Sequence, residues 1–425
     1  MRFLYAAISY PDVAKNTNMY TMLVRELVDL NHEVRVIAPI FDGVTRETIE
    51  GGVPVLRVKS GPIFNTNLIL KGLNTLWLNP RYKRAIKQAW PDWSMDWVIT
   101  STPPITLSPF IQGLKTRCNA RLYLILRDIF PQNAKDLSMI KDPFLFAYFR
   151  QRERHLYRIS DIIGCMSPGN IEFLCKQDPN TFGANKLTYL PNWTRPTNRL
   201  AQQQPKNSFR KRFNLEGKFI ALFGGNFGKP QKIEFVLDLA QHVKHLSDVV
   251  FCLIGDGTEK ERIRQLVHSR GLDNVPVLDR LPREEYQSLV HEADIGMVNL
   301  SEKFTIPNIP SRTLGYWDAS LPVLAATDRH TDLNKNFLEK YNAGLWAETG
   351  KLEDYYSQFM RLYHDPELRK TMGENGRKAV ETDFSVQTAA REMINQMCKF
   401  QDRVGEGERW EDGKMRRWED EKMRR

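Results

Sequence analysis

The sequence has few cysteines and no residue pattern that commonly binds a metal. Its 425 residues include five cysteines, and none of them forms a C-x-x-C pair. The eight histidines show no H-x-x-x-H spacing, and the globular part has no D-x-D pair. These absences argue against a zinc site and a disulfide framework, and they favour a reducing compartment. We therefore expect a reaction that needs neither a metal nor another bound cofactor.

Long apolar segments and several enzyme motifs are also missing. No stretch approaches about 18 uninterrupted apolar residues, and the N-terminal run MRFLYAAISYP is too short for a secretory signal. Both features predict a cytoplasmic protein. The sequence has no G-x-S-x-G elbow, and no G-x-G-x-x-G opens either half of the chain. Serine hydrolases of that class and nicotinamide-dependent dehydrogenases are therefore disfavoured.

The formal charge of +10 favours an acidic partner. Nucleic acid is a poor candidate, because no helix-turn-helix, zinc-finger or RNA-binding signature is present. An anionic membrane surface fits better, because residues 68–90 combine apolar, aromatic and basic groups as a lipid interface does. The residues concerned are Leu73, Leu76, Trp77, Arg81, Lys83, Arg84 and Lys87. A surface helix with a solvated basic face explains the segment equally well.

The length predicts two domains, and the residue pattern predicts that both are α/β. Strand-like apolar runs alternate with helix-like amphipathic runs in two blocks, which indicates two doubly wound, Rossmann-like parallel sheets facing across a cleft. The predicted strands are Phe3–Ile8, Val34–Ala38, Trp97–Thr100, Leu122–Leu126, Ile162–Met166, Leu187–Leu190, Phe219–Phe223, Val249–Ile254, Val275–Leu278, Ile295–Val298 and Val323–Ala326. Ligands of such sheets bind at the carboxyl ends of the strands.

Five segments follow from this pattern. Residues 1–195 form the N-terminal domain, 196–208 a polar linker, and 209–385 the C-terminal domain. Residues 386–402 form a helix that is a candidate to return to the N-terminal domain. Residues 403–425 contain an eight-residue charged repeat without a wide apolar stripe, and we expect a solvated helix or a disordered tail.

Four loops of the second block are candidates for a phosphate-binding site. The first contains Gly225, Asn226, Gly228, Lys229 and Gln231, where glycines allow close approach of backbone N–H groups and the lysine adds charge. The second contains Gly255, Asp256 and Gly257, and the third Leu281. The fourth contains Asn308, Ile309, Pro310, Ser311 and Arg312, with Ser311 as the expected N-cap of a helix. Each loop alone is explained equally well as an ordinary turn.

The first block carries a charged pair at the carboxyl end of a predicted strand. Arg127 and Asp128 directly follow Leu122–Leu126, and Ser101-Thr102-Pro103-Pro104 follows the preceding strand. Functional groups occupy this position in doubly wound folds. A structural ion pair or a capping aspartate is the alternative.

These motifs, in this order and spacing, resemble glycosyltransferase family 4, whose fold is the two-domain GT-B type. The likeness extends from about residue 1 to residue 400 and is strongest to the branch with colanic acid and O-antigen glycosyltransferases. It rests on STPP at 101–104, RDIFP at 127–131, LPNW at 190–193, GNFGKPQ at 225–231, IGDG at 254–257, ADIGMV at 293–298 and NIPSRTLGYWDASLPVLA at 308–325.

The resemblance implies a retaining transfer of a hexosyl or N-acetylhexosaminyl group from a nucleotide-sugar, with a UDP-sugar favoured. The acceptor would be a glycan, lipid-linked by analogy, in bacterial surface polysaccharide synthesis at the cytoplasmic face of the inner membrane. It assigns Asp128, Arg127 and Lys229 to the reacting centre and the four glycine- and arginine-containing loops to the donor. Acceptor binding falls to the first domain, with Tyr10, Asn16, Asn18 and Thr102 as candidates.

Two positions depart from the family pattern. Members often carry two glutamates eight residues apart, where this chain has Pro307 and Gly315, and a Gly-Gly where it reads Asn16-Thr17-Asn18. Two alternatives therefore stay open: an inactive GT-B protein that binds a nucleotide or glycan, and a GT-B sugar-nucleotide epimerase. The missing glutamate pair makes the epimerase less attractive, because that reaction needs an acid and a base around the sugar.

Overall fold

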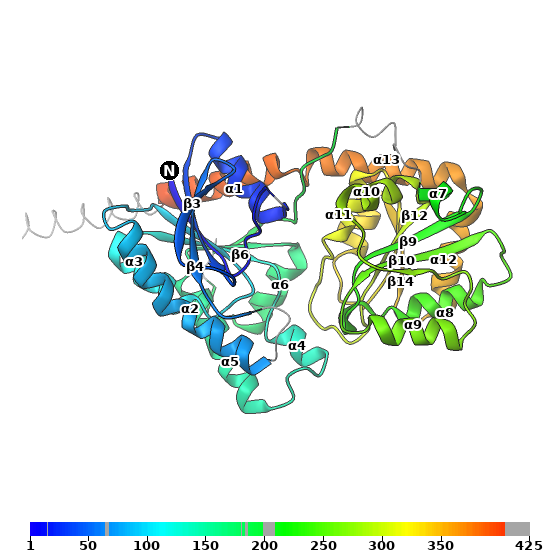
Figure 1. The fold of residues 1–425 in the computed structure, drawn as a ribbon, viewed down its shortest axis with the longest axis horizontal. Helices are drawn as coiled ribbons and strands as arrows, with labels where there is room; N and C mark the ends of the chain where they lie inside the picture. The colour runs from blue at the N-terminus through cyan, green and yellow to red at the C-terminus, as the bar shows by residue number, and fades with distance from the viewer. Residues whose placement is uncertain (15, 64–67, 180, 183–185, 199–208, 404–425) are drawn as a thin grey trace, which may run out of the picture.

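The computed structural model describes residues 1–14, 16–63, 68–179, 181–182, 186–198 and 209–403, and it contains two α/β domains, each with its own sheet (Figure 1). Residues 199–208 of the expected linker and residues 404–425 of the expected charged tail lie outside the described residues.

The N-terminal domain is built on an eight-stranded sheet in the order β3-β4-β2-β1-β5-β6-β7-β8. All neighbouring strands are parallel except β3 and β4. The strands are β1 (Arg2–Ala6), β2 (Glu33–Ile40), β3 (Arg46–Glu50), β4 (Val53–Lys59), β5 (Trp97–Ser101), β6 (Arg121–Leu126), β7 (Ile162–Cys165) and β8 (Leu187–Tyr189). The β3–β4 hairpin was not predicted. It turns at Gly51 and Gly52, whose φ angles of 58° and 83° suit a two-residue hairpin.

Helices cover both faces of this sheet. One face packs against α2 (Leu68–Ala89), α3 (Ser108–Cys118), α5 (Pro143–Ile159) and α6 (Pro168–Gln177), which share one hydrophobic cluster with it. The short α4 (Gln132–Asp136) follows β6. The opposite face packs against α1 (Met19–Asp29) and the final helix of the described chain, residues 386–403. Both faces are buried, which explains why the strands read as continuous apolar runs.

The C-terminal domain has a six-stranded parallel sheet in the order β11-β10-β9-β12-β13-β14. Its strands are β9 (Phe219–Asn226), β10 (Val249–Asp256), β11 (Val277–Leu278), β12 (Ile295–Asn299), β13 (Val323–Thr327) and β14 (Gly344–Glu348). Its helices are α7 (Phe209–Arg212), α8 (Glu234–His242), α9 (Lys260–Ser269), α10 (Arg283–Glu292), α11 (Arg312–Asp318), α12 (Leu352–His364) and α13 (Pro366–Thr382), with a 3₁₀ turn at Lys229–Gln231 and a π-helical turn at Asn334–Glu339. Helices α8, α9 and α12 cover one face, and α7, α10, α11 and α13 the other.

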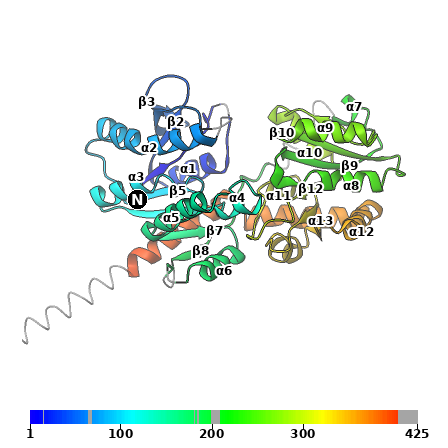
Figure 2. The same ribbon diagram turned by 90° about the horizontal axis from the view of Figure 1, so that it is seen from below.

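The chain crosses between the domains twice, and the two crossings lie side by side. Thr194 and Ser385 form an isolated parallel bridge, with Thr194 N donating to Phe384 O at 2.9 Å. The final helix then packs beside β7 and β8, where it is drawn in red in Figure 2. There Gln396 accepts a hydrogen bond from Tyr123 and donates one to Tyr189 O. The last described helix is therefore part of the N-terminal domain.

Helices α11 and α13 approach each other closely because α13 carries two glycines, Gly373 and Gly376, at the contact. A Cβ atom on Gly373 of α13 would lie 2.0 Å from the carbonyl oxygen of Ser320, directly after α11. Gly315, on the exposed side of α11, would meet nothing within 4 Å. Packing therefore requires the two glycines of α13 but not Gly315.

We expect Gly373→Ala to lower the free energy of unfolding by about 1–3 kcal/mol, because the added methyl group must push the two helices apart. Gly315→Ala is the matched control and should raise it by up to about 1 kcal/mol, through the better helix propensity of alanine. Urea unfolding followed by circular dichroism measures both. Equal stabilities of the two variants would contradict this account of the helix contact.

Candidate functional site

The four candidate donor loops all leave the sheet at its carboxyl edge, because β9, β10, β11 and β12 are parallel. Gly225 and Gly255 are register partners at the ends of β9 and β10. A Cβ atom on Gly255 would lie 1.7 Å from Gly225 O, so this position accepts only glycine. Asn226 and Gly257 also lie close, since a Cβ on Gly257 would be 2.5 Å from Asn226 Oδ1. The first two loops therefore form one surface.

Arg312 of the fourth loop lies against Gly225 of the first loop. A Cβ atom on Gly225 would lie 3.0 Å from Arg312 Nη2, and the guanidinium carbon lies 4.5 Å from the centre of the Phe223 ring. Within the described part of the chain, the buried Arg312 Nη1 has no hydrogen-bond partner. Burial lowers the pKa of Arg312, and the nearby Tyr316 and Tyr286 oppose that shift. A buried cation beside an exposed glycine backbone is a favourable place for an anion.

Lys229 lies next to this pair in a 3₁₀ turn that begins after Gly228. Its side chain is exposed and forms no ion pair with the residues that the structure describes. Pro230 O accepts a hydrogen bond from Ser301 N at 2.8 Å, which joins this turn to the loop after β12. Gln231 contributes a buried Oε1 atom that lacks a described partner. The turn therefore adds one exposed cation and one acceptor without a described partner to the surface.

The remaining donor candidates differ in their surroundings. Asn308 Nδ2 is buried and has no partner among the described residues, Ile309 is buried, and Pro310 is half-buried. Asp256 is exposed and accepts a hydrogen bond from Gly257 N at 2.8 Å. Leu281, after β11, packs partly into a hydrophobic cluster. Ser311 precedes α11 as expected, but its side chain makes no capping hydrogen bond, so the predicted capping role is wrong.

In the N-terminal domain, Asp128 is exposed at the carboxyl end of β6, whereas Arg127 is buried. The Arg127 guanidinium donates to Leu190 O at 3.0 Å and Pro191 O at 3.3 Å and lies 4.6 Å from the Trp193 ring centre. These partners hold Arg127 against the backbone of its own domain. Its part in the reaction stays a prediction. Partial desolvation raises the pKa of Asp128, against the opposing charge of Arg127.

Three of the acceptor candidates are buried or hydrogen-bonded within the N-terminal domain. Tyr10 is buried in the hydrophobic core, and Thr102 is buried and accepts a hydrogen bond from Arg127 N at 3.0 Å. Asn18 caps α1, with Oδ1 accepting from Tyr20 N and Thr21 N, both at 3.0 Å. These contacts are structural, and binding of an acceptor by the three residues stays a prediction. Asn16 is exposed, and its Oδ1 accepts from Thr17 N at 2.9 Å.

Tyr20 is a half-buried residue of this face that the sequence did not single out. Its ring stacks on Tyr5 with centroids 5.8 Å apart and meets the edge of Trp193 at 6.5 Å. Burial raises the pKa of Tyr20, Arg127 lowers it, and the nearby Asp128 raises it. Tyr20 therefore shares the exposed end of β6 with Asp128. A tyrosine on the first helix after a short loop gave no signal by which sequence alone could find it.

The domains meet through the loop between β12 and α11, residues 300–311. Phe304 and Ile306 of this loop are buried in the hydrophobic cluster of the N-terminal domain. Asp136 Oδ2 in α4 accepts hydrogen bonds from Thr305 N at 2.8 Å and Thr305 Oγ1 at 2.9 Å. At the start of α6, Gly169 N donates to Asp332 Oδ2 at 2.5 Å. The loop that leads into Arg312 is therefore in contact with the N-terminal domain.

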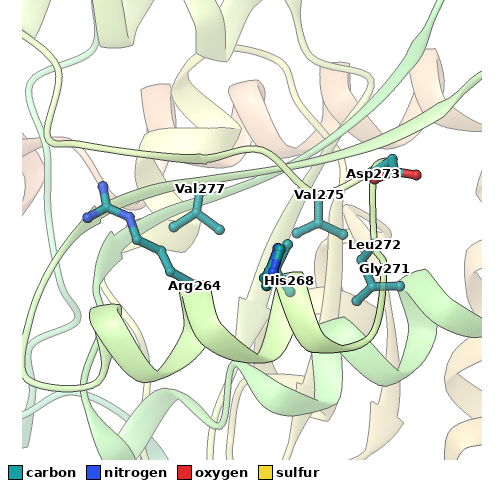
Figure 3. Close-up of a pocket in the computed structure, with 8 residues that line it drawn as sticks. Arg264, His268, Gly271, Leu272, Asp273, Val275 and Val277 are labelled. Carbon is teal, nitrogen blue, oxygen red and sulfur yellow. The ribbon is translucent and has the colours of Figure 1, made fainter.

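A pocket lies in the C-terminal domain away from the predicted site residues. Figure 3 shows a pocket of about 240 Å³ between α9 and β11, lined by Arg264, His268, Leu272 and Val275, and none of the predicted site residues lines it. Among the described residues, no group of three His, Cys, Asp or Glu side chains is placed to hold a metal ion.

Asp328 is a second residue that the sequence did not assign. It follows β13, is buried, and its Oδ2 has no hydrogen-bond partner among the described residues. Its Oδ1 accepts from His330 N at 2.9 Å. Burial raises the pKa of Asp328 to about 7, backbone hydrogen bonds oppose the rise, and Asp136 of the other domain adds to it. An incompletely satisfied carboxyl group therefore lies near the junction of the domains.

This pKa predicts a pH-dependent loss of stability. The folded carboxyl group keeps its proton up to about pH 7, whereas the unfolded one releases it near pH 4, so the folded state loses stability between about pH 4 and pH 7. We expect Asp328→Asn to remove this loss and to be more stable at pH 7 by about 2–4 kcal/mol. The advantage should shrink toward pH 4. Urea unfolding at several pH values tests this, and parallel pH profiles of variant and wild type would contradict it.

Known proteins resemble this chain in sequence and in fold. Residues 205–379 match the family model described as glycosyl transferases group 1. "Probable glycosyltransferase WbjE" of Pseudomonas aeruginosa is 23% identical over 241 residues, which cover 56% of this chain and 59% of that relative. The matched part thus spans less than two thirds of that relative's length.

Solved structures show the same fold over nearly the whole chain. Sucrose-phosphate synthase of Thermosynechococcus elongatus superposes with a TM-score of 0.73 at 16% identity, covering 94% of this chain and 98% of that one. HepE of Anabaena, solved in complex with UDP, gives 0.67 at 13% identity, covering 94% and 100%. The GT-B architecture predicted from the sequence is confirmed. The match of residues 205–379 to the model described as glycosyl transferases group 1 also confirms the resemblance carried by the motifs.

Proposed function

We propose that this chain is a retaining, metal-independent glycosyltransferase. It moves a hexosyl or N-acetylhexosaminyl group from a nucleotide-sugar, with a UDP-sugar favoured, to a glycan acceptor in bacterial surface polysaccharide synthesis. The C-terminal domain binds the donor and the N-terminal domain the acceptor. The acceptor is lipid-linked, and the protein works peripherally at the cytoplasmic face of the inner membrane.

One observation carries the donor assignment. The half-buried Arg312 lies against the backbone of Gly225, and its buried Nη1 atom has no partner among the described residues. The exposed Lys229 belongs to the same loop as Gly225. Two cations at one glycine-lined edge suit a diphosphate, which offers several acceptor oxygens and two or more negative charges. The unpartnered atoms of Gln231 and Asn308 add polar groups for the rest of the donor. HepE, which has this fold, was solved with UDP bound.

The chemistry follows from the charges. The bond between the sugar C1 and the phosphate oxygen breaks, the diphosphate leaves with the electron pair, and an acceptor hydroxyl oxygen bonds to C1. Lys229 and Arg312 stabilise the charge that develops on the departing diphosphate. Asp128, whose pKa is raised, is suited to take the proton released by the hydroxyl group.

Gly315 supports a donor site that differs from the family pattern. The glutamate that family members often carry there is absent, yet a Cβ at this position would meet nothing within 4 Å. Space for a side chain or a ligand group is therefore available. The inactive binding protein and the epimerase remain the alternatives, and nucleotide binding followed by product analysis separates them from the transferase.

We expect the wild type to bind one nucleoside diphosphate of a UDP, GDP, ADP and CDP panel selectively, with and without magnesium. Lys229→Ala should weaken that binding by about tenfold to a hundredfold, because it removes a charge-assisted contact. Lys232→Ala is the matched control, since Lys232 Nζ pairs with Glu302 at 3.3 Å. Isothermal titration calorimetry gives each Kd. No binding to any nucleotide would refute the donor site, and equal losses in the two variants would refute the role of Lys229.

The membrane assignment rests on exposed apolar side chains. Helix α2 buries Leu78, Tyr82 and Ile86, but its opposite side exposes Leu70, Leu73, Leu76 and Trp77, with Trp77 59% exposed. Arg81 and Arg84 continue the stripe of Leu73 and Trp77 at helical spacing, and Lys83 and Lys87 are exposed beside it. The helix thus presents an apolar half followed by a basic half, as an anionic lipid surface favours.

A second apolar group lies on the same side of the domain. Met139, Phe144, Leu145 and Tyr148 are exposed before and within the first turns of α5, and Phe144 is 85% exposed. Helix α3 contacts both α2 and α5, and all three cover one face of the sheet. Figure 1 shows α2 and α5 together at the lower end of this domain. No helix of the described residues is long and apolar enough to span a bilayer, so the proposed contact is peripheral.

We expect Trp77→Ser combined with Phe144→Ser to weaken binding to vesicles containing phosphatidylglycerol at least tenfold, because each exposed ring that enters the interface contributes about 1–2 kcal/mol. Reversing the charges of Arg81, Lys83, Arg84 and Lys87 should weaken binding to these anionic vesicles similarly. The same charge reversal should not change binding to vesicles of phosphatidylcholine, which carries no net charge. Ile49→Ser, which alters an exposed apolar residue of β3, is the control. Vesicle co-sedimentation measures the binding, and unchanged binding of the substituted proteins would overturn the membrane assignment.

A further inference from the structure

The loop that leads into Arg312 is held near its end through three consecutive backbone carbonyl groups of its own. Its sequence Ile306-Pro307-Asn308-Ile309-Pro310 contains two prolines, which have no N–H and disfavour helix in the residue before them. The segment therefore cannot form a regular ladder of backbone hydrogen bonds. Its carbonyl oxygens need partners from elsewhere, since most of the segment is buried.

The partners come alternately from the two domains. Asn170 Nδ2, at the start of α6 in the N-terminal domain, donates to Pro307 O at 2.6 Å. Thr331 Oγ1 of the C-terminal domain donates to Asn308 O at 2.9 Å. Asn192 Nδ2, which follows β8 in the N-terminal domain, donates to Ile309 O at 3.0 Å. The loop is thus clamped between the domains immediately before Ser311 and Arg312.

The two asparagines are poorly explained by stability alone. Asn170 is 0% and Asn192 3% exposed, and within the described chain the Oδ1 atom of each is buried without a partner. A buried amide with an unsatisfied oxygen costs free energy that an apolar residue of similar size would avoid. What each amide provides is a hydrogen-bond donor at a fixed point on the loop.

We propose that Asn170 and Asn192 are positioning residues for the nucleotide-sugar site of the other domain. They fix the carbonyl groups of Pro307 and Ile309, and this places Arg312 against Gly225. The donor site is therefore complete only when the N-terminal domain is docked on the loop. Gly169 N, bonded to Asp332, and Asp136, bonded to Thr305, hold the same junction. This inference rests on the donor role proposed above.

The test compares Asn170→Asp and Asn192→Asp with wild type in the full chain. Aspartate has nearly the same shape, but it has no N–H to give to the loop carbonyl. Asn274→Asp is the matched control, because Asn274 Nδ2 donates to Ala240 O at 3.3 Å and its Oδ1 also lacks a described partner, all within the C-terminal domain. We expect the first two variants to bind UDP or GDP about tenfold more weakly, as the loss of one buried hydrogen bond predicts. The control should bind as wild type does.

Titration calorimetry gives the affinities, and thermal unfolding of the same samples separates positioning from general destabilisation. The positioning role predicts that the Asn170 and Asn192 variants bind the nucleotide more weakly than Asn274→Asp does. This difference should hold even where all three variants have equally lowered melting temperatures. If an aspartate variant does not fold, Asn170→Ser or Asn192→Ser, which are smaller and uncharged, replaces it. Unchanged or tighter binding by the variants would overturn this inference alone. No nucleotide binding by the wild type would overturn the proposed function and this inference with it.

Discussion

The arrangement of the candidate site depends on one loop that both domains hold. Residues 300–311 leave β12 in the C-terminal domain, yet Phe304 and Ile306 are buried among side chains of the N-terminal domain. Burial of each such side chain contributes about 1.5–3 kcal/mol, more than one surface hydrogen bond does. The same loop is also attached to its own domain, because Ser301 N donates a hydrogen bond to Pro230 O in the turn that contains Lys229. The relative position of the domains and the shape of the donor surface are therefore set by the same contacts.

The sheet architecture could be predicted because parallel strands buried on both faces leave a strong signal in the sequence. All eleven predicted strands correspond to strands of the structure, most of them shifted at their ends by a few residues. The hairpin of β3 and β4 was missed because β3, with the sequence RETIE, is mostly exposed and carries three charges. The signal was nevertheless present, since Gly51-Gly52 separates two stretches rich in β-branched residues. Strand β14 was also missed, although it pairs in parallel with β13, as the other strands of this sheet do with their neighbours.

The site was only partly predictable, and sequence distance explains why. Loops that follow neighbouring parallel strands must share an edge, so the convergence of Gly225, Gly255 and Arg312 could be expected. The contacts from Asn170 to Pro307 and from Asn192 to Ile309 join residues 137 and 117 positions apart, and no local pattern pairs them. Asn18 and Ser311 show the same limit on a smaller scale. Asn18 was expected at an acceptor and caps a helix, whereas Ser311 was expected to cap a helix and does not.

The two buried arginines show what a structure adds to a motif. Arg127 and Arg312 each follow a predicted strand or loop end, and each guanidinium lies about as far from an aromatic ring, 4.6 Å from Trp193 and 4.5 Å from Phe223. From the sequence, Arg127 was expected at the reacting centre and Arg312 in the donor site. Arg127, however, donates to the carbonyl groups that begin the crossing between the domains, at Leu190 and Pro191. Arg312 has no such partner in the described chain. A buried cation is stabilised by what completes its hydrogen bonds. For Arg127 that is the backbone of its own domain. For Arg312 we propose that it is the diphosphate of the donor, and this assigns the proposed anion site to the C-terminal domain.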